Sequence, residues 1–95
     1  LLSDEARQKA AVIYQALQEA KVAFTKGEQN ALKLAEIVQQ TISAEPLARI
    51  DYVAVVDGET LQPIEKIGDR EAIVAAAVFF GDVRLIDNIV LNRKQ

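Results

Sequence analysis

The chain of 95 residues contains no histidine, cysteine, methionine or tryptophan, and aromatic residues make up only 5% of it. The lack of cysteine excludes a disulfide, a zinc–thiolate site and a thiol nucleophile, and it fits a reducing compartment. The lack of histidine excludes a catalytic triad with a histidine base and a histidine-rich metal site. Any chemistry would therefore have to come from carboxylates, lysine or tyrosine alone.

Several other signals are also missing. No apolar run approaches the roughly 20 residues needed to span a bilayer, and no basic segment followed by an apolar one opens the chain. The formal net charge is −3 and no basic stripe is present, so nucleic-acid binding is not expected. No glycine-rich phosphate-binding pattern occurs. We expect a cytoplasmic protein with neither a membrane nor a nucleic acid as partner.

What is present predicts two helices followed by strands. Ser3 is a suitable N-cap before Asp4 and Glu5, and Gly27 is a suitable stop, so the first helix is expected over Asp4 to Lys26. Its apolar positions recur at steps of three and four, which places them on one face. These positions are Ala10, Ile13, Tyr14, Leu17, Ala20 and Phe24.

The second helix is expected over Ala31 to Ala44. Asn30 can cap it, and Pro46 prevents it from continuing. The helical stripe here is Ala31, Leu34, Ala35, Val38 and Ile42. The short connection through Gly27 makes the two helices antiparallel neighbours.

A strand is expected over Leu47 to Asp57, where β-branched and aromatic residues are frequent and Asp57-Gly58 ends the run. Alternation places Ile50, Tyr52, Ala54 and Val56 on one face, and Arg49, Asp51, Val53 and Val55 on the other. Pro63 makes the stretch from Leu61 to Lys66 irregular or a short edge piece, and Gly68-Asp69-Arg70 predicts a further turn.

The tail predicts a hairpin of Ala72 to Phe80 and Val83 to Leu91 around the dipeptide Gly81-Asp82. A two-residue turn fixes the register. One face then pairs Phe80 with Val83, Val78 with Leu85, Ala76 with Asp87 and Val74 with Ile89, and the other pairs Phe79 with Arg84, Ala77 with Ile86 and Ala75 with Asn88. Both faces are largely apolar, and two helices can cover only one of them. We therefore expect another domain, another chain or the body of a larger enzyme to pack against the other face.

The predicted fold class is α+β, with two antiparallel helices packed on a small, mainly antiparallel sheet of about three strands. Residues 1–95 are expected to form a single domain. The start at Leu1-Leu2, with no initiator methionine, suggests a piece of a longer protein. A processed or trimmed small protein is the alternative.

Few side chains are candidates for chemistry. Arg84 and Asp87 lie three apart on a strand, so they face opposite ways and cannot pair directly. Asp51 and Asp57 are predicted to share a face about 20 Å apart, which is too far for a pair of glycosidase carboxylates.

The remaining candidates favour structural roles. Gly58 and Gly81 are expected to be turn glycines, and Tyr14 to lie in the core. Burial is also favoured for Tyr52, with a hydroxyl that reaches a partner as the alternative. The run from Ala75 to Ala77 is expected to allow close approach of a helix or a foreign backbone. No residue is assigned as catalytic, cofactor-binding or metal-binding, because no nucleophile, base and electrophilic group come together.

The chain resembles the C-terminal domain of the pantothenate synthetase (pantoate–β-alanine ligase) family. Leu2-Ser3 leads into an acidic first turn, with Ala6 where the family usually has glutamate and with Arg7 kept. Gly27-Glu28 matches the turn between the helices. The stretch Ile50-Asp51-Tyr52-Val53-Ala54-Val55-Val56-Asp57, followed by Glu59-Thr60-Leu61, and the tail Arg84-Leu85-Ile86-Asp87-Asn88 match two further motifs. The similarity covers essentially the whole chain in order.

The resemblance implies a larger two-domain ligase that uses ATP and Mg²⁺. In such an enzyme ATP activates pantoate to an adenylate, and β-alanine then displaces AMP. The resemblance also implies that the nucleotide motif with histidines and the pantoate pocket belong to an N-terminal Rossmann-like domain, which would be the partner of this chain, and that the whole enzyme is a homodimer. The Ser-Ser-Arg-Asn segment of the family is absent here, and so is every histidine, so the family's catalytic residues have no positions in this chain to map onto. The resemblance implies that this chain acts as a lid that excludes water from the reactive adenylate.

A different class of function is the alternative. The chain could be a free-standing interaction or dimerisation module that uses its uncovered sheet face. The gene upstream of Leu1 distinguishes the two hypotheses: a Rossmann-like domain with the histidine motif supports the lid, and a start codon at Leu1 supports the module.

Overall fold

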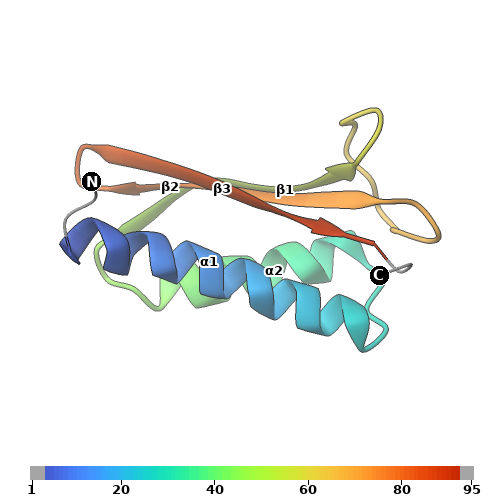
Figure 1. Ribbon diagram of the computed structural model, residues 1–95, viewed down its shortest axis with the longest axis horizontal. Helices are drawn as coiled ribbons and strands as arrows, with labels where there is room; N and C mark the ends of the chain where they lie inside the picture. The colour runs from blue at the N-terminus through green and yellow to red at the C-terminus, as the bar shows by residue number, and fades with distance from the viewer. Residues whose placement is uncertain (1–3, 93–95) are drawn as a thin grey trace.

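The computed structural model describes residues 4–92, which form two helices and one three-stranded antiparallel sheet. The order along the chain is α1 (Asp4–Thr25), α2 (Ala31–Ser43), β1 (Ala48–Asp57), β2 (Ala72–Phe80) and β3 (Val83–Leu91). Both helices lie on one side of the sheet, and the other side is left uncovered (Figure 1). The predicted α+β class and the predicted elements are confirmed, with ends that agree to within one residue.

The helices begin and end where the sequence predicts. Asp4 and Glu5 provide the acidic first turn of α1, whereas Ser3, the predicted cap, is outside the described residues. Gly27 adopts a φ of +114°, which lets the chain turn back directly after α1. The side chain of Asn30 accepts a hydrogen bond from the Lys33 amide at 3.2 Å and caps α2.

The core lies between the helices and the sheet. Its largest fully buried side chains are Ile13, Leu17, Leu34, Val38, Ile42, Ile67, Val74, Val78 and Leu91. Tyr14 is not among them, because 58% of its surface is exposed, so the prediction of a buried Tyr14 was wrong. Successive helical residues are about 100° apart, and Tyr14 therefore lies well to one side of the stripe centred on Ile13.

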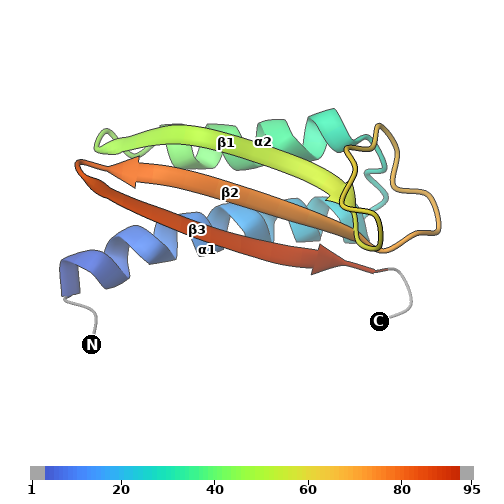
Figure 2. The same ribbon diagram turned by 90° about the horizontal axis from the view of Figure 1, so that it is seen from above.

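The strand order is β1-β2-β3, so β2 is the central strand (Figure 2). The register of β2 and β3 is as predicted from Phe80↔Val83 through Val74↔Ile89. Gly81 has a φ of +63°, as the two-residue turn requires. A tight turn between two periodic strands was enough to fix this pairing from the sequence.

The pairing of β1 with β2 contains an irregularity that the sequence did not reveal. Ile50 pairs with Val78 and Tyr52 with Ala77, so Asp51 is an extra residue in β1. This bulge reverses the alternation: Ile50 packs against the core with Val53 and not on the face of Tyr52. The predicted faces of the first half of β1 were therefore wrong.

Candidate functional site: the uncovered face of the sheet

The face of the sheet that the helices leave bare is called the open face here. Its residues follow from the register and are Arg49, Asp51, Tyr52, Ala54, Val56, Ile73, Ala75, Ala77, Phe79, Arg84, Ile86, Asn88 and Val90. Three large apolar or aromatic members remain exposed, namely Tyr52 by 40%, Ile86 by 55% and Val90 by 38%. The prediction that Tyr52 is mostly buried was wrong, whereas the predicted apolar character of both sheet faces is confirmed.

The centre of the open face is lined by small side chains. Across the three strands, Ala54 lies beside Ala75 and Ala75 beside Asn88. Ala77 has no exposed surface, because Tyr52 and Ile86 flank it on the neighbouring strands. Of the run from Ala75 to Ala77, Ala76 belongs to the core and Ala77 is covered, so the close approach of a foreign backbone at this run stays a prediction.

One end of the open face carries a cluster of charged and aromatic side chains. The Arg84 guanidinium donates through Nε to Asp51 Oδ2 at 3.0 Å, and its Nη2 lies 2.9 Å from the same oxygen. Arg84 also lies 5.9 Å from the ring centre of Tyr52 and 6.0 Å from that of Phe79. A second guanidinium, that of Arg49, stacks over the Phe79 ring at 4.5 Å. Guanidinium groups are favoured against aromatic faces at these distances.

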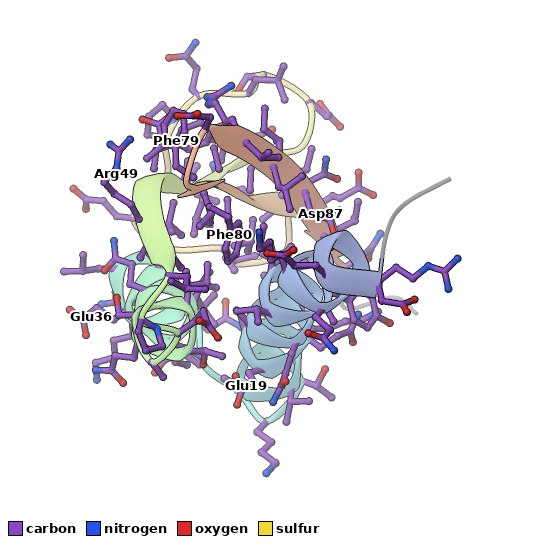
Figure 3. The ribbon with its side chains drawn as sticks, turned by 90° about the vertical axis from the view of Figure 1, so that its left-hand side faces the viewer. Glu19, Glu36, Arg49, Phe79, Phe80 and Asp87 are labelled. Carbon is purple, nitrogen blue, oxygen red and sulfur yellow. The ribbon has the colours of Figure 1, made fainter. Side chains whose placement is uncertain are left out.

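This cluster joins two of the segments that carry the family resemblance, and the bulge at Asp51 makes the contact possible. The segment around Asp51 and the tail beginning at Arg84 are separated by 33 residues. Phe79 and Arg49 lie on the side of the sheet away from the helices, whereas Phe80 points between the sheet and the helices (Figure 3). Asp51 and Arg84 each keep more than a third of their side-chain surface exposed, with 38% and 41%. Both remain accessible to a further partner.

Neither of the two pairs weighed from the sequence, Arg84 with Asp87 and Asp51 with Asp57, is brought together. Arg84 binds Asp51 and not Asp87, as the strand geometry predicts, and the Asp87 carboxylate accepts from the Asn88 amide at 2.8 Å. Asp57 pairs with the core residue Ala72, so it belongs to the covered face. The prediction that Asp51 and Asp57 share a face was wrong, because the bulge at Asp51 shifts the alternation of the residues that follow it.

Asp57 instead organises the segment of residues 58–63. Its Oδ1 accepts from the Glu59 amide at 2.7 Å and from the Thr60 amide at 3.1 Å, and Arg70 lies 3.3 Å from Oδ2. These two amides, in that order, and then the Arg70 charge hold the pKa of the Asp57 carboxyl below its ordinary value of 3.8. The segment rises above the plane of the sheet on the open side (yellow, Figure 1).

Two hollows in the described part of the chain lie away from the open face. One, of about 410 Å³, is lined by residues of α2, by Val55 and by Ile64 and Glu65. The other, of about 210 Å³, lies between the start of α1 and Phe80. Within residues 4–92 no group of three acidic side chains could hold a metal ion, and no helix is long and apolar enough to cross a membrane. Neither hollow gathers a nucleophile with a base.

Comparisons with known proteins agree with this architecture. The family model described as "Pantoate-beta-alanine ligase" matches residues 1–90. The pantothenate synthetase of Thermotoga petrophila is 47% identical over 91 residues and that of Clostridioides difficile 45%, in each case over 96% of this chain and 32% of the relative. The crystal structure of pantothenate synthetase from Thermus thermophilus superimposes with a TM-score of 0.73 at 35% identity, over 93% of this chain and 31% of that one. The chain thus spans about a third of the length of these relatives.

Proposed function

Because the chain belongs to the pantoate–β-alanine ligase family, we propose that it is the C-terminal lid of such an enzyme. The complete enzyme would condense pantoate and β-alanine with ATP, through a pantoyl adenylate, to give pantothenate. The observation that carries the proposal is the difference in length between this chain and its relatives. Relatives of about three times this length match it over 96% of its residues, so most of the enzyme lies outside it.

The chemistry of the described residues supports the proposal that this chain covers an active site formed by the rest of the enzyme. The sequence has no histidine to act as a base, and no acidic cluster among residues 4–92 fits Mg²⁺. We therefore assign ATP, Mg²⁺ and the reacting groups to the remaining two thirds of the enzyme, which would act in the cytoplasm. No step of the reaction is placed on a residue of this chain.

The open face is the surface that we assign to the contact with the rest of the enzyme. Tyr52, Ile86 and Val90 are exposed there, and the Asp51–Arg84 pair connects two segments typical of the family on this face. Closure over the cleft would bury this apolar surface, which favours the closed state by about 25 cal/mol for each Å² removed from water. A closed lid also keeps water from the acyl adenylate, which hydrolysis would otherwise destroy.

The proposal is tested by assaying pantothenate formation from pantoate, β-alanine and ATP. We expect the isolated chain to show none and the full-length protein that contains it to turn over. Turnover by the isolated chain would contradict the lid assignment, because the chain would then contain the catalytic machinery.

The exposed apolar residues of the open face also favour a second candidate, a module that dimerises through this face. Sedimentation of the isolated chain at low micromolar concentration distinguishes the two. A dimer whose association is abolished by Ile86→Lys would support the module, whereas a monomer would count against it.

A further inference from the structure

Leu61 combines two unfavourable properties. Its φ is +61°, and it is the one non-glycine residue among residues 4–92 with a positive φ. A leucine in this left-handed region is strained, because its Cβ approaches the backbone too closely. The residue is also 62% exposed, so burial in the core does not offset the strain.

Hydrogen bonds on both sides force the backbone into this conformation. The Leu61 amide donates to the Asp57 carbonyl at 2.9 Å, and the Asp57 amide donates to the Gln62 carbonyl at 2.9 Å. Thr60 Oγ1 accepts from the Gln62 amide at 3.2 Å, and the Asp57 carboxylate holds the two preceding amides. A strained residue that its surroundings fix so completely is typical of a functional contact.

We propose that Leu61 is a docking residue that inserts into an apolar recess of the remaining two thirds of the enzyme when the lid closes. This inference rests on the lid function proposed above. The segment that carries Leu61 rises on the open side of the sheet, the side assigned to that contact (Figure 1). The relatives are about three times as long as this chain, so a large part of the same polypeptide is available as the occupant. An exposed leucine would find its favourable environment there.

The test uses variants that separate docking from folding. Leu61→Asn and Leu61→Gly both remove the apolar side chain and both tolerate a positive φ. Leu32→Gln is the matched control, because Leu32 is a comparably exposed leucine, by 68%, on the helix side. Ile86→Lys alters the open face itself and tests the lid function separately.

In the full-length protein we expect both Leu61 variants to lower kcat/KM for pantothenate formation roughly tenfold, the effect of losing one buried leucine contact. We also expect more AMP released per pantothenate formed, because a loosely closed lid admits water to the adenylate. In the isolated chain the same variants should leave the unfolding temperature unchanged or higher. Leu32→Gln should match the wild type in all three measurements.

Either of two results would overturn the proposal without touching the lid function. In the first, both Leu61 variants keep the wild-type kcat/KM and AMP release, whereas Ile86→Lys lowers kcat/KM and raises AMP release. The lid function would then stand without a role for Leu61. The second is a lower unfolding temperature of the isolated chain in both variants, which makes Leu61 a purely structural residue. If neither Leu61→Asn nor Ile86→Lys changes activity, the lid function assigned to the open face fails as well.

Discussion

At the scale of single residues, Asp57 shows how one carboxylate can hold a surface segment in place. It accepts from two successive amides and pairs with Arg70, whose side chain is half exposed. The charged form of Asp57 is favoured in the folded state, so its folded pKa lies below the ordinary value of 3.8. The stability that it contributes is therefore complete well above pH 3.8 and is lost as the pH falls through the folded pKa.

This linkage predicts the behaviour of Asp57→Asn. The variant should have a lower unfolding temperature than the wild type at pH 7. The difference should shrink as the pH falls from 3.8 through the lower pKa of the folded state, because protonation of the wild-type carboxyl then removes its advantage. Thermal unfolding followed by circular dichroism between pH 7 and pH 2 provides the measurement. Asp82→Asn, in the exposed hairpin turn, is the control and should follow the wild type. A difference that stays constant over this range would refute the assigned role of the charge.

Two features of single residues could not be predicted from the sequence. The Asp51–Arg84 pair joins residues 33 apart and depends on the extra residue in β1. A bulge has no clear signal in a run of β-branched and aromatic residues, so simple alternation assigned the wrong face to Ile50. The strained φ of Leu61 was missed as well. The segment Asp57-Gly58-Glu59-Thr60 could have suggested it, because aspartate and threonine favour such local side-chain to backbone bonds.

At the scale of elements, local signals predicted most of the fold. The dipeptide Gly81-Asp82 fixed the register of β2 and β3, because a two-residue turn leaves no alternative pairing. Asn30 and Pro46 set the limits of α2 to within one residue. Tyr14 was the exception on α1, because a residue at the border of an apolar stripe can fall on either side of the buried zone.

The cap of α2 gives a prediction for this scale. Asn30→Ala should lower the free energy of unfolding by about 1 kcal/mol, because the Lys33 amide loses its side-chain acceptor. For a domain of this size the unfolding temperature should fall by about 4–8 °C. Lys33→Ala is the matched control, since it keeps the backbone amide that donates, and it should change stability much less. Equal losses in both variants would contradict the capping role.

At the scale of the whole molecule, the two faces of the sheet have different roles. The helices and the covered face form the core, and nearly all of the fully buried side chains are found between them. The open face has exposed apolar residues, small side chains at its centre and a charged and aromatic cluster at one end. Sequence patterning predicted that one face would stay bare, because two helices cannot cover both sides of a sheet. It could not identify the partner of that face.

The most direct test measures whether the open face is shielded in the full-length protein. Since this chain has no cysteine, Ile86→Cys places a single reactive thiol of the chain on that face, and Val22→Cys places one on the exposed surface of α1. Labelling at each position, with pantoate and ATP present, is followed by peptide mass. The lid account predicts that the thiol at position 86 reacts roughly tenfold or more slowly in the full-length protein than in the isolated chain, whereas position 22 reacts equally in both. Equal labelling rates of position 86 in the full-length protein and in the isolated chain would contradict the lid account.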